Sequence, residues 1–522
     1  MLDAPSPFFS PPPPTRHPSH PPRTQTTMTT DKPGRFYGFV SIFYRNWITL
    51  AGFFLAVAAA FAFVLLFAID LIAHGGNQYM GILAYLVAPA FFFMGMGIVA
   101  VGWWLHRRRL RAQGGALPAL AVSIDLSRSD HRKQLFLFLS GATVFLLLTA
   151  FGSYQTYHYT ESTQFCGSMC HSVMEPEYVT YQHSPHARVA CVECHIGSGA
   201  TWYVKSKLSG AYQVYSVIAK KYQQPIPTPV HNLRPAQDTC EQCHWPEKFS
   251  GDLVKTYQHF LSDDENTPYT VRVALRVGGG SPERGPVSGI HWHASAGNVV
   301  EYIATDEKRQ NIPWVRVTDE RGQVKIYATE EFRETPPPGE IRRMDCMDCH
   351  NRPAHTFKAP NNLVEQAMAL GRVDSALPAF KPKAVAALTA DYKTVDEAMA
   401  GIAATMREAY PDRQTVQGAI EELQRIYREN FFPYMQARWD RYPENIGHKD
   451  WAGCFRCHDG EHQTPDTRET IKANDCNACH LFLAQGTGEQ LQKLAAFGMP
   501  FEHPAGDVEG MLCSDCHNGA NQ

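Results

Sequence analysis

The chain lacks a marked excess of charge of either sign, because 48 Lys and Arg residues stand against 51 Asp and Glu residues in a length of 522. A formal net charge of −3 excludes a generally basic nucleic-acid-binding protein. We also expect no cleavable signal peptide, because the first apolar run begins late and is longer than the apolar core of a signal sequence. We therefore expect that run to be an uncleaved membrane anchor.

Charged residues are scarce in three long apolar runs, residues 48–73, 79–105 and 135–151, each long enough to cross a bilayer. Lys and Arg are absent from residues 74–79 but frequent before the first run and between the second and third. By the positive-inside rule, we expect a multi-pass protein of the cytoplasmic (inner) membrane, with everything after the third run in the periplasm. A buried core helix is the alternative for any single run.

No cysteine stands alone. The 14 cysteines form seven pairs, each followed directly by a histidine; six pairs have the spacing CxxCH, and the first, CGSMCH, has one more residue. In such a unit the two thiols form thioethers with one haem c and the histidine binds its iron. Zinc ribbons and disulfides are the alternatives, but neither requires a histidine after every pair. The pattern predicts seven covalently bound haem c groups, a chemistry that also fits a location outside the cytoplasm.

The motifs are numbered 1 to 7 in chain order. Their residues are Cys166, Cys170 and His171; Cys191, Cys194 and His195; Cys240, Cys243 and His244; Cys346, Cys349 and His350; Cys454, Cys457 and His458; Cys476, Cys479 and His480; and Cys513, Cys516 and His517.

Eleven further histidines follow the apolar runs, and several of them lie near a motif or in a tight loop. A second histidine on the iron fills both axial positions and suits electron relay rather than substrate binding. The predicted distal ligands are His186, His231, His355, His448, His462 and His503, with His291 and His293 of GIHWHAS as reserves. Which of them serves which haem stays open at this point.

The regions between the motifs differ in pattern. Residues 1–47 are Pro-rich and predicted to be a disordered cytoplasmic segment, followed by the three-helix anchor at 48–153. Alternating hydrophobicity with the turn DERG predicts a small β-rich insertion at 251–340, and apolar residues three and four apart predict α-helices at 361–440.

The haem regions are expected to have little regular structure, because the macrocycles supply the apolar core. They are residues 154–250 with motifs 1 to 3, 341–360 with motif 4 and 441–522 with motifs 5 to 7. The predicted fold class is therefore a membrane-anchored multihaem c-type cytochrome, with three transmembrane helices, a haem-packed periplasmic region, a small β insertion and several α-helices.

The stretches FCGSMCHSVMEPEY, SPHARVACVECHIG and WYVKSKLSG, after an apolar anchor, resemble the NapC/NirT family of membrane-bound multihaem quinol dehydrogenases. The likeness is best over residues 154–246, with the fourth motif at Cys346. The whole pattern is similar to the inner-membrane heptahaem cytochromes of dissimilatory metal-reducing bacteria. This resemblance implies that the chain oxidises menaquinol from the quinone pool and passes electrons to periplasmic c-type cytochromes, and ultimately to extracellular metal.

The resemblance also implies that haem 1 lies near the membrane and that its iron takes a methionine that follows the motif. Met174 is the candidate here, with His171 and Met169 as rivals, because the usual position two residues after the motif histidine holds Val173. In the family, a lysine after the second motif contributes to the quinol pocket. Lys205 and Lys207 match its neighbourhood.

A proton acceptor is required as well, because oxidising a quinol releases two protons together with two electrons. Asp70, near the outer end of the first apolar run, is an ionisable group at an energetically costly depth and is one candidate. Glu161, Glu175 and Glu177 in the segment around motif 1 are alternatives.

Two other functions compete with quinol oxidation. The first is a multihaem reductase of nitrite or hydroxylamine with one open iron, which the lack of a CxxCK unit and the many histidines disfavour. The second is a haem-wire subunit of a larger membrane complex in which another subunit handles the quinone. Ligand-binding spectra would reveal the first, and direct reduction of the purified chain by quinol would exclude the second.

Overall fold

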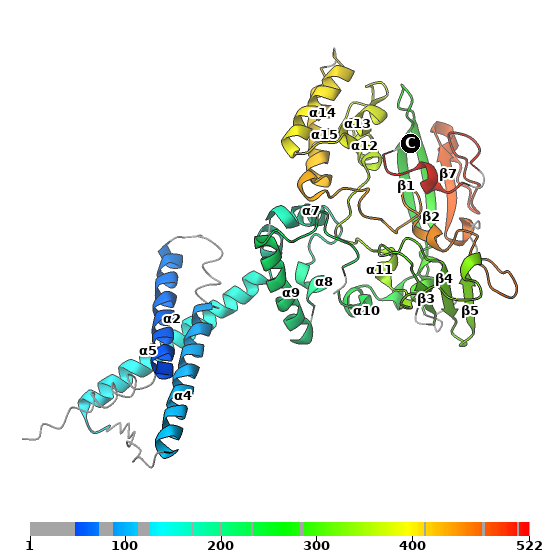
Figure 1. Cartoon of the computed structure of the whole chain (residues 1–522). Helices are drawn as coiled ribbons and strands as arrows, with labels where there is room; N and C mark the ends of the chain where they lie inside the picture. Colours follow the sequence, from blue (N-terminus) through cyan, green and yellow to red (C-terminus); the bar gives the residue numbers. More distant parts are fainter. Residues whose placement is uncertain are drawn as a thin grey trace, which may run out of the picture. The chain divides into compact units, whose positions relative to one another are not determined.

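The computed structural model describes residues 47–72, 87–112, 126–169, 171–197, 200–230, 233–281, 287–295, 297–411, 414–471, 476–508 and 511–520 (Figure 1). The predicted disordered segment therefore lies almost wholly outside the described residues. The chain divides into two compact units, residues 1–157 and 158–522. Each unit is described by itself.

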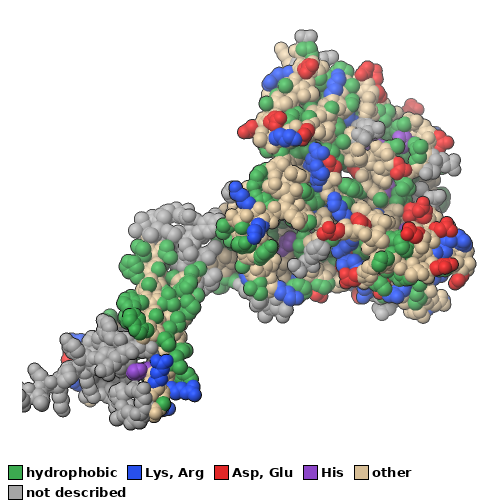
Figure 2. Space-filling view, viewed as in Figure 1, with side chains coloured by type: hydrophobic (Ala, Val, Ile, Leu, Met, Phe, Trp, Pro, Cys, Tyr) green, Lys and Arg blue, Asp and Glu red, His purple; other side chains and the backbone are tan. Residues whose placement is uncertain are grey.

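The first unit contains the helices α2 (Trp47–Ile72) and α4 (Ala88–Ala112), which pack closely against each other. Small residues make this approach possible: a Cβ on Gly52 would lie 2.7 Å from the backbone nitrogen of Val99, and one on Gly95 would lie 2.6 Å from that of Ala56. Large apolar side chains such as Phe54 cover the outer surface, which Figure 2 shows as mostly hydrophobic. That surface suits a lipid environment.

Two helices in the described part of the chain are long and apolar enough to cross a membrane, over Trp47–Ala68 and Ala88–Arg109. The predicted third span lies inside a long continuous helix, α5 (Ser129–Thr160), several of whose side chains are not described. The third span therefore stays a prediction. The start of the predicted second span, residues 79–86, is also outside the described residues.

In the second unit, the motifs lie on or beside helical elements, most of which have one or two turns. These elements are α6 (Thr163–Ser168), α7 (His171–Gln182), α8 (Cys191–His195), α9 (Ala200–Ile218), α10 (Ala236–Thr239), η2 (Cys240–Gln242), η3 (Pro246–Lys248), α11 (Cys346–Cys349), η8 (Gly453–Arg456), η9 (Cys476–Ala478) and α16 (Cys513–Cys516). Only α7 and α9 exceed two turns, as expected for regions whose core is supplied by a bound group.

Two antiparallel sheets follow motif 3. One has the order β5-β4-β3-β6, from β5 (Val324–Ala328), β4 (Trp314–Thr318), β3 (Val299–Ile303) and β6 (Arg342–Arg343), and it contains the predicted hairpin as β4 paired with β5. The other has the order β1-β2-β7, from β1 (Leu253–Phe260), β2 (Pro268–Leu275) and β7 (His480–Gly486).

Strand β7 corrects the prediction of little regular structure after residue 441. It comes from the C-terminal region and pairs with β2, although more than half of that sheet lies in the predicted insertion. The segment HLFLAQG is short and follows directly on motif 6, so its β-pattern is hard to separate from the motif. The pairing of β7 with β2 therefore joins the C-terminal region to residues 253–275.

The apolar core of this unit is built by four amphipathic helices: α12 (Pro360–Ala369), α13 (Phe380–Thr389), α14 (Val395–Ala409) and α15 (Val416–Asn430). Their inward faces bury Phe380, Leu388, Ile402 and Leu423 completely. Removing that apolar surface from water stabilises the unit by roughly 1.5 to 3 kcal/mol for each such side chain. Four further 3₁₀ elements are η5 (Ile290–Ala294), η6 (Glu330–Phe332), η7 (Pro433–Met435) and η10 (Gly488–Gln492).

Candidate functional site

Each CxxCH motif closes on a local turn that fixes its histidine relative to its first cysteine. In motifs 3, 4, 5 and 7 the backbone N–H of the histidine donates to the carbonyl of that cysteine, at 2.8, 2.8, 3.1 and 2.9 Å respectively. No disulfide joins the cysteines that the structure describes. The described residues also contain no group of three or more His, Cys, Asp and Glu side chains suited to holding a metal ion.

The six motif histidines after motif 1 each lie beside one other histidine ring. The pairs are His195 with His355, His244 with His186, His350 with His291, His458 with His293, His480 with His448, and His517 with His503. The ring centroids are 5.9 to 6.3 Å apart in all six pairs.

This separation fits two imidazoles on opposite sides of one metal ion. A metal–nitrogen bond of about 2 Å on each side, plus the radius of each ring, puts the two centroids about 6 Å apart. Direct stacking or hydrogen bonding of the rings would not require the same separation six times. The residues present therefore fit haem iron held by one motif histidine and one distal histidine.

Backbone carbonyls orient four of the distal rings through Nδ1. The Nδ1–H groups of His186, His291, His293 and His355 donate to carbonyl oxygens at 3.1, 3.1, 2.8 and 2.8 Å respectively. With Nδ1 protonated and held in this way, Nε2 keeps its lone pair, which is the arrangement that a metal-binding histidine needs.

Burial also favours the neutral ligand form of six of these twelve rings. It lowers the pKa of His195, His293, His350, His448, His480 and His517. Because a metal binds the neutral imidazole, this shift keeps the rings in the binding form at neutral pH.

The structure contradicts the prediction that His462 is a distal ligand. Its side chain is 1% exposed, its Nδ1 lies 2.8 Å from the Asp459 carboxylate, and its Nε2 lies 2.7 Å from the carbonyl oxygen of Ile312. Both ring nitrogens are therefore engaged, and His462 is a structural residue. The predicted ligand His231 lies outside the described residues. The reserves His291 and His293 lie beside motif histidines instead.

Motif 1 packs through a close contact between a glycine and a tyrosine. A Cβ on Gly167 would lie 2.1 Å from the ring of Tyr178 on α7, so this position in the wide spacer admits no side chain. Helix α7 also carries Met174, three residues after His171 and therefore on the same face. The side chains of Cys170 and His171 are outside the described residues, so the ligand of haem 1 stays a prediction.

The lysines of the predicted quinol site occupy different environments on α9. The Nζ of Lys207 lies 3.4 Å from the Glu161 carboxylate, and both charges act on the thiol of Cys166 in motif 1. Lys205 is exposed and lies over the ring of Trp202 at 4.6 Å. Asp70 belongs to α2, but its side chain is not described. Of the predicted residues, the structure thus brings Lys207 and Glu161 together beside motif 1.

Comparison with known proteins gives the family. The model of the NapC/NirT cytochrome c family, N-terminal region, matches residues 128–228. The cytochrome c-type protein ImcH of Geobacter sulfurreducens is 41% identical over 491 residues, which cover 91% of this chain and 95% of that protein. The chain belongs to the NapC/NirT family of c-type cytochromes.

A second relative, the cytochrome c-type protein NrfH of Wolinella succinogenes, is 35% identical over 78 residues, or 14% of this chain and 44% of that protein. No solved structure matches the chain. As a NapC/NirT cytochrome, the chain carries covalently bound haem c and is a multihaem protein of electron transfer. The histidine pairs described above are consistent with that cofactor.

Consecutive motifs of this NapC/NirT cytochrome contact one another. Cys166 of motif 1 lies beside Cys191 of motif 2, and Cys240 of motif 3 lies beside Cys346 of motif 4. Motifs 2 and 3 are joined through His186, which precedes motif 2 and pairs with the histidine of motif 3. Helices α8, α10 and α11 follow in this order across the second unit (Figure 1).

Motifs 4 to 7 are also connected to one another in the order of the sequence. In the spacer of motif 5, Arg456 donates to the backbone oxygen of Asp348 in motif 4 at 2.7 Å. Its neighbour Phe455 stacks on His448, which pairs with the histidine of motif 6, with ring centroids 4.3 Å apart. Motifs 6 and 7 are connected through Phe482 and Phe501, whose rings stack with centroids 5.0 Å apart.

Sequence reasoning missed the buried support of motif 4. Asp348, in its spacer, is 3% exposed and accepts hydrogen bonds from the Tyr302 hydroxyl at 2.5 Å and from Arg309 at 3.2 Å. Tyr302 lies on β3 and is fully buried, so the sheet holds the motif in place. The acidic spacer residue of CMDCH was the available signal, because a buried carboxylate needs hydrogen-bonding partners.

Proposed function

We propose that this cytochrome oxidises menaquinol at the periplasmic face of the inner membrane and passes the electrons through seven haem c groups to periplasmic c-type cytochromes. In a metal-reducing bacterium, extracellular metal is the final acceptor. The observation that supports the relay best is the set of six histidine pairs, each with the separation of two axial ligands. When bound, each haem accepts and donates one electron at a time.

The paired histidines would hold a haem iron from both sides, and an iron held in this way would have no open position. This arrangement supports electron relay over the alternative of nitrite or hydroxylamine reduction, which needs an iron that can bind substrate. The series of contacts from motif 1 to motif 7 supports the same role, because each motif lies beside the next.

Electron entry is proposed at motif 1, with Met174 as the ligand of haem 1. Glu161 is the proton acceptor that the side chains of this region support best, because its carboxylate lies 3.4 Å from the Lys207 ammonium. The Glu161 carboxylate can accept a hydrogen bond and a proton from a quinol hydroxyl. Lys207 itself can donate a hydrogen bond that orients the quinol. Lys205 and Asp70 stay as further candidates for the same site.

Stopped-flow absorbance tests this proposal. The oxidised, detergent-solubilised, full-length protein is mixed with menadiol, and the α-band of reduced haem is followed. Rapid reduction of the wild type is expected, with at least about tenfold slower reduction in Glu161→Gln and Lys207→Ala, because a positioned acid–base group contributes about a hundredfold or more. Reduction by dithionite should not change.

Glu193→Gln is the matched control, because Glu193 is an exposed carboxylate in motif 2 without this ion pair. Wild-type protein that dithionite reduces fully but menadiol does not would overturn quinol oxidation and favour a haem-wire subunit of a larger complex. Equal rates in all variants would leave quinol oxidation standing but remove Glu161 and Lys207 from its site.

A further inference from the structure

Arg234, two residues before α10, is a cation whose buried donor groups have no acceptor. Its Nε and Nη1 atoms are both closed off from solvent, and neither has a hydrogen-bond partner in the part of the chain that the structure describes. Leaving a buried charged donor unpaired is costly, so folded proteins provide an acceptor for such groups. An acceptor that does not belong to the polypeptide fits this place.

The guanidinium of Arg234 is held against the end of motif 2. The backbone N–H of Gly197, two residues after His195, donates to the Val192 carbonyl at 2.7 Å, which folds the chain back onto the motif. Gly197 has a φ of +65°, and a Cβ on it would lie 1.7 Å from Nη1 of Arg234. Only glycine leaves room for the guanidinium here. The unpaired donors are therefore fixed beside the turn that attaches haem 2.

A second cation lies close to the same aromatic ring. The Nζ of Lys205 is 4.6 Å from the ring centroid of Trp202 on α9, and the Cζ of Arg234 is 5.9 Å from it. The indole attracts both cations but carries no net charge that could neutralise them. Two positive charges around one ring, one of them with buried free donors, create a potential that attracts an anion.

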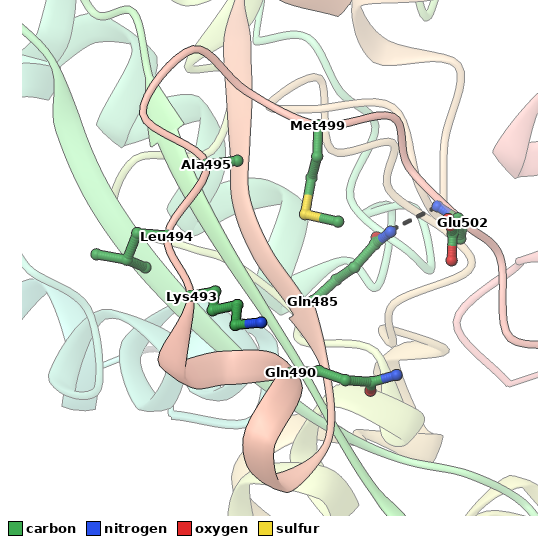
Figure 3. A pocket seen from close by; sticks show the side chains of 7 residues that line it. All are labelled: Gln485, Gln490, Lys493, Leu494, Ala495, Met499 and Glu502. Atoms are coloured by element: carbon green, nitrogen blue, oxygen red, sulfur yellow. Dashed lines mark hydrogen bonds between the residues drawn. The ribbon is translucent and has the colours of Figure 1, made fainter.

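The pocket beside β7 differs from this place, because its polar side chains find partners within the chain. It has a volume of about 300 Å³. Gln485 in its wall donates to the Pro500 carbonyl at 3.1 Å and accepts from the Glu502 N–H at 3.3 Å, the bond that Figure 3 shows. Gln490 accepts from the Thr487 N–H at 2.9 Å. The amides of this pocket therefore do not require a ligand.

A haem supplies an anion suited to the donors of Arg234. Each haem c has two propionate groups at the edge of its ring, and an ionised carboxylate accepts strong, charge-assisted hydrogen bonds from a guanidinium. A partly buried propionate needs a cation for the same reason that a buried guanidinium needs an acceptor. One contact between the two groups satisfies both requirements.

We propose that Arg234 binds a propionate of the haem attached at motif 2. The guanidinium donates to the carboxylate and places a positive charge beside haem 2. Because a nearby positive charge disfavours the ferric state, Arg234 raises the potential of this haem. The assignment rests on the proposed haem at motif 2, but it does not require quinol as the electron donor.

Resonance Raman spectroscopy of the full-length, detergent-solubilised protein tests this contact. The frequency of the propionate bending vibration depends on the hydrogen bonds that the carboxylate accepts. We expect one shifted propionate band in the difference spectrum between wild type and Arg234→Gln. Arg234→Lys should also change the band, because an ammonium replaces the planar guanidinium.

The Raman result separates a propionate from other anions. Because the vibration belongs to the haem, an acidic side chain or a lipid phosphate bound to Arg234 would leave the band unchanged and would overturn the proposal. Mass spectrometry of the intact protein counts the attached haems, and Arg234→Lys serves for the comparison if Arg234→Gln loses one. A wild type without a haem at motif 2 would overturn the relay as well, whereas a fully loaded protein with no Raman change would overturn this proposal alone.

Spectropotentiometry at about pH 9, where propionates are ionised, gives an independent measurement. Arg234→Gln should lower the potential of one haem and leave the others in place. The same transition should rise in Glu177→Gln, because the Glu177 carboxylate lies 3.2 Å from Nδ1 of His355, the partner of haem 2. Arg188→Gln is the control: Arg188 is exposed three residues before Cys191, so its removal should shift the potential by at most about half as much. An equal shift in the control, or a shift of a different transition, would overturn the assignment.

Discussion

Glu177 gives a quantitative test of the pairing of His195 with His355. Its backbone carbonyl accepts the Nδ1–H of His355 at 2.8 Å, and its carboxylate lies 3.2 Å from the same nitrogen and 3.1 Å from Arg352. The Glu177 side chain is 16% exposed. Substitution by glutamine removes the negative charge while the backbone contact that orients His355 remains.

The size of the effect follows from the distance between that carboxylate and the iron. The 3.2 Å contact, the width of the imidazole and a metal–nitrogen bond of about 2 Å add up to about 7 Å. A unit charge at that distance changes the energy of a one-electron oxidation by about 2.4 kcal/mol at a dielectric constant of 20, and by about 0.6 kcal/mol in water. We therefore expect Glu177→Gln to raise the potential of haem 2 by about 25 to 100 mV.

A spectropotentiometric titration, with electron paramagnetic resonance of the low-spin haems, measures this shift. One transition should move to higher potential and the others should stay. Glu175→Gln is the control, because Glu175 is exposed on the same helix. The pairing of His195 with His355 would be refuted if no haem transition moved by more than the control, or if the potential fell.

Three further predictions concern other parts of the second unit. Lys381→Met should lower the free energy of unfolding by about 1 to 3 kcal/mol, measured by thermal circular dichroism, because the buried Glu365 carboxylate would lose the Lys381 ammonium and keep only His259 and the Phe260 N–H as partners. Burial raises the pKa of Glu365, but hydrogen bonding and the neighbouring positive charges outweigh burial and lower that pKa to about 2, below the value near 4.3 in an unfolded chain. The stabilisation of the wild type by Glu365 should therefore be present above about pH 4.3 and be lost as the pH falls towards 2. Thermal melts over a series of pH values would show or contradict this loss. His293→Ala should produce one high-spin haem in the absorption spectrum, whereas His462→Ala should lower stability without that signal; a high-spin haem in the second variant would reverse the two assignments. Gly167→Ala should slow reduction by menadiol through displacement of motif 1, and a wild-type rate would show that Tyr178 moves aside at little cost.

The sequence predicted the haem attachment residues because thioether chemistry requires a local pattern. It also predicted that distal ligands would be found among a small set of histidines. It did not predict their partners, because His355 comes from beyond motif 4 and meets His195 only through the fold. His462 was misassigned for a related reason: a histidine near a motif looks the same in sequence whether iron or Asp459 holds it.

The β-strands likewise include some that the sequence predicted and one that it did not predict. The hairpin of β4 and β5 was visible from its alternation and its turn, both of which are local. Strand β7 was missed because its partner β2 lies some two hundred residues earlier, and non-local pairing leaves little mark on a short segment. The hydrogen bond from Tyr302 to Asp348 was not predicted either, because these two residues also lie far apart in the sequence.

The positions of the paired histidines along the chain also determine the order in which the haem ligands become available during synthesis. In five of the six pairs the distal histidine precedes its motif in the chain, so both ligands would already be present when the haem is attached. Haem 2 is different, because His355 emerges long after His195 and after motif 4. Until His355 is present, an iron bound at motif 2 would lack its second histidine, and a change from high spin to low spin would show that the chain extends as far as residue 355.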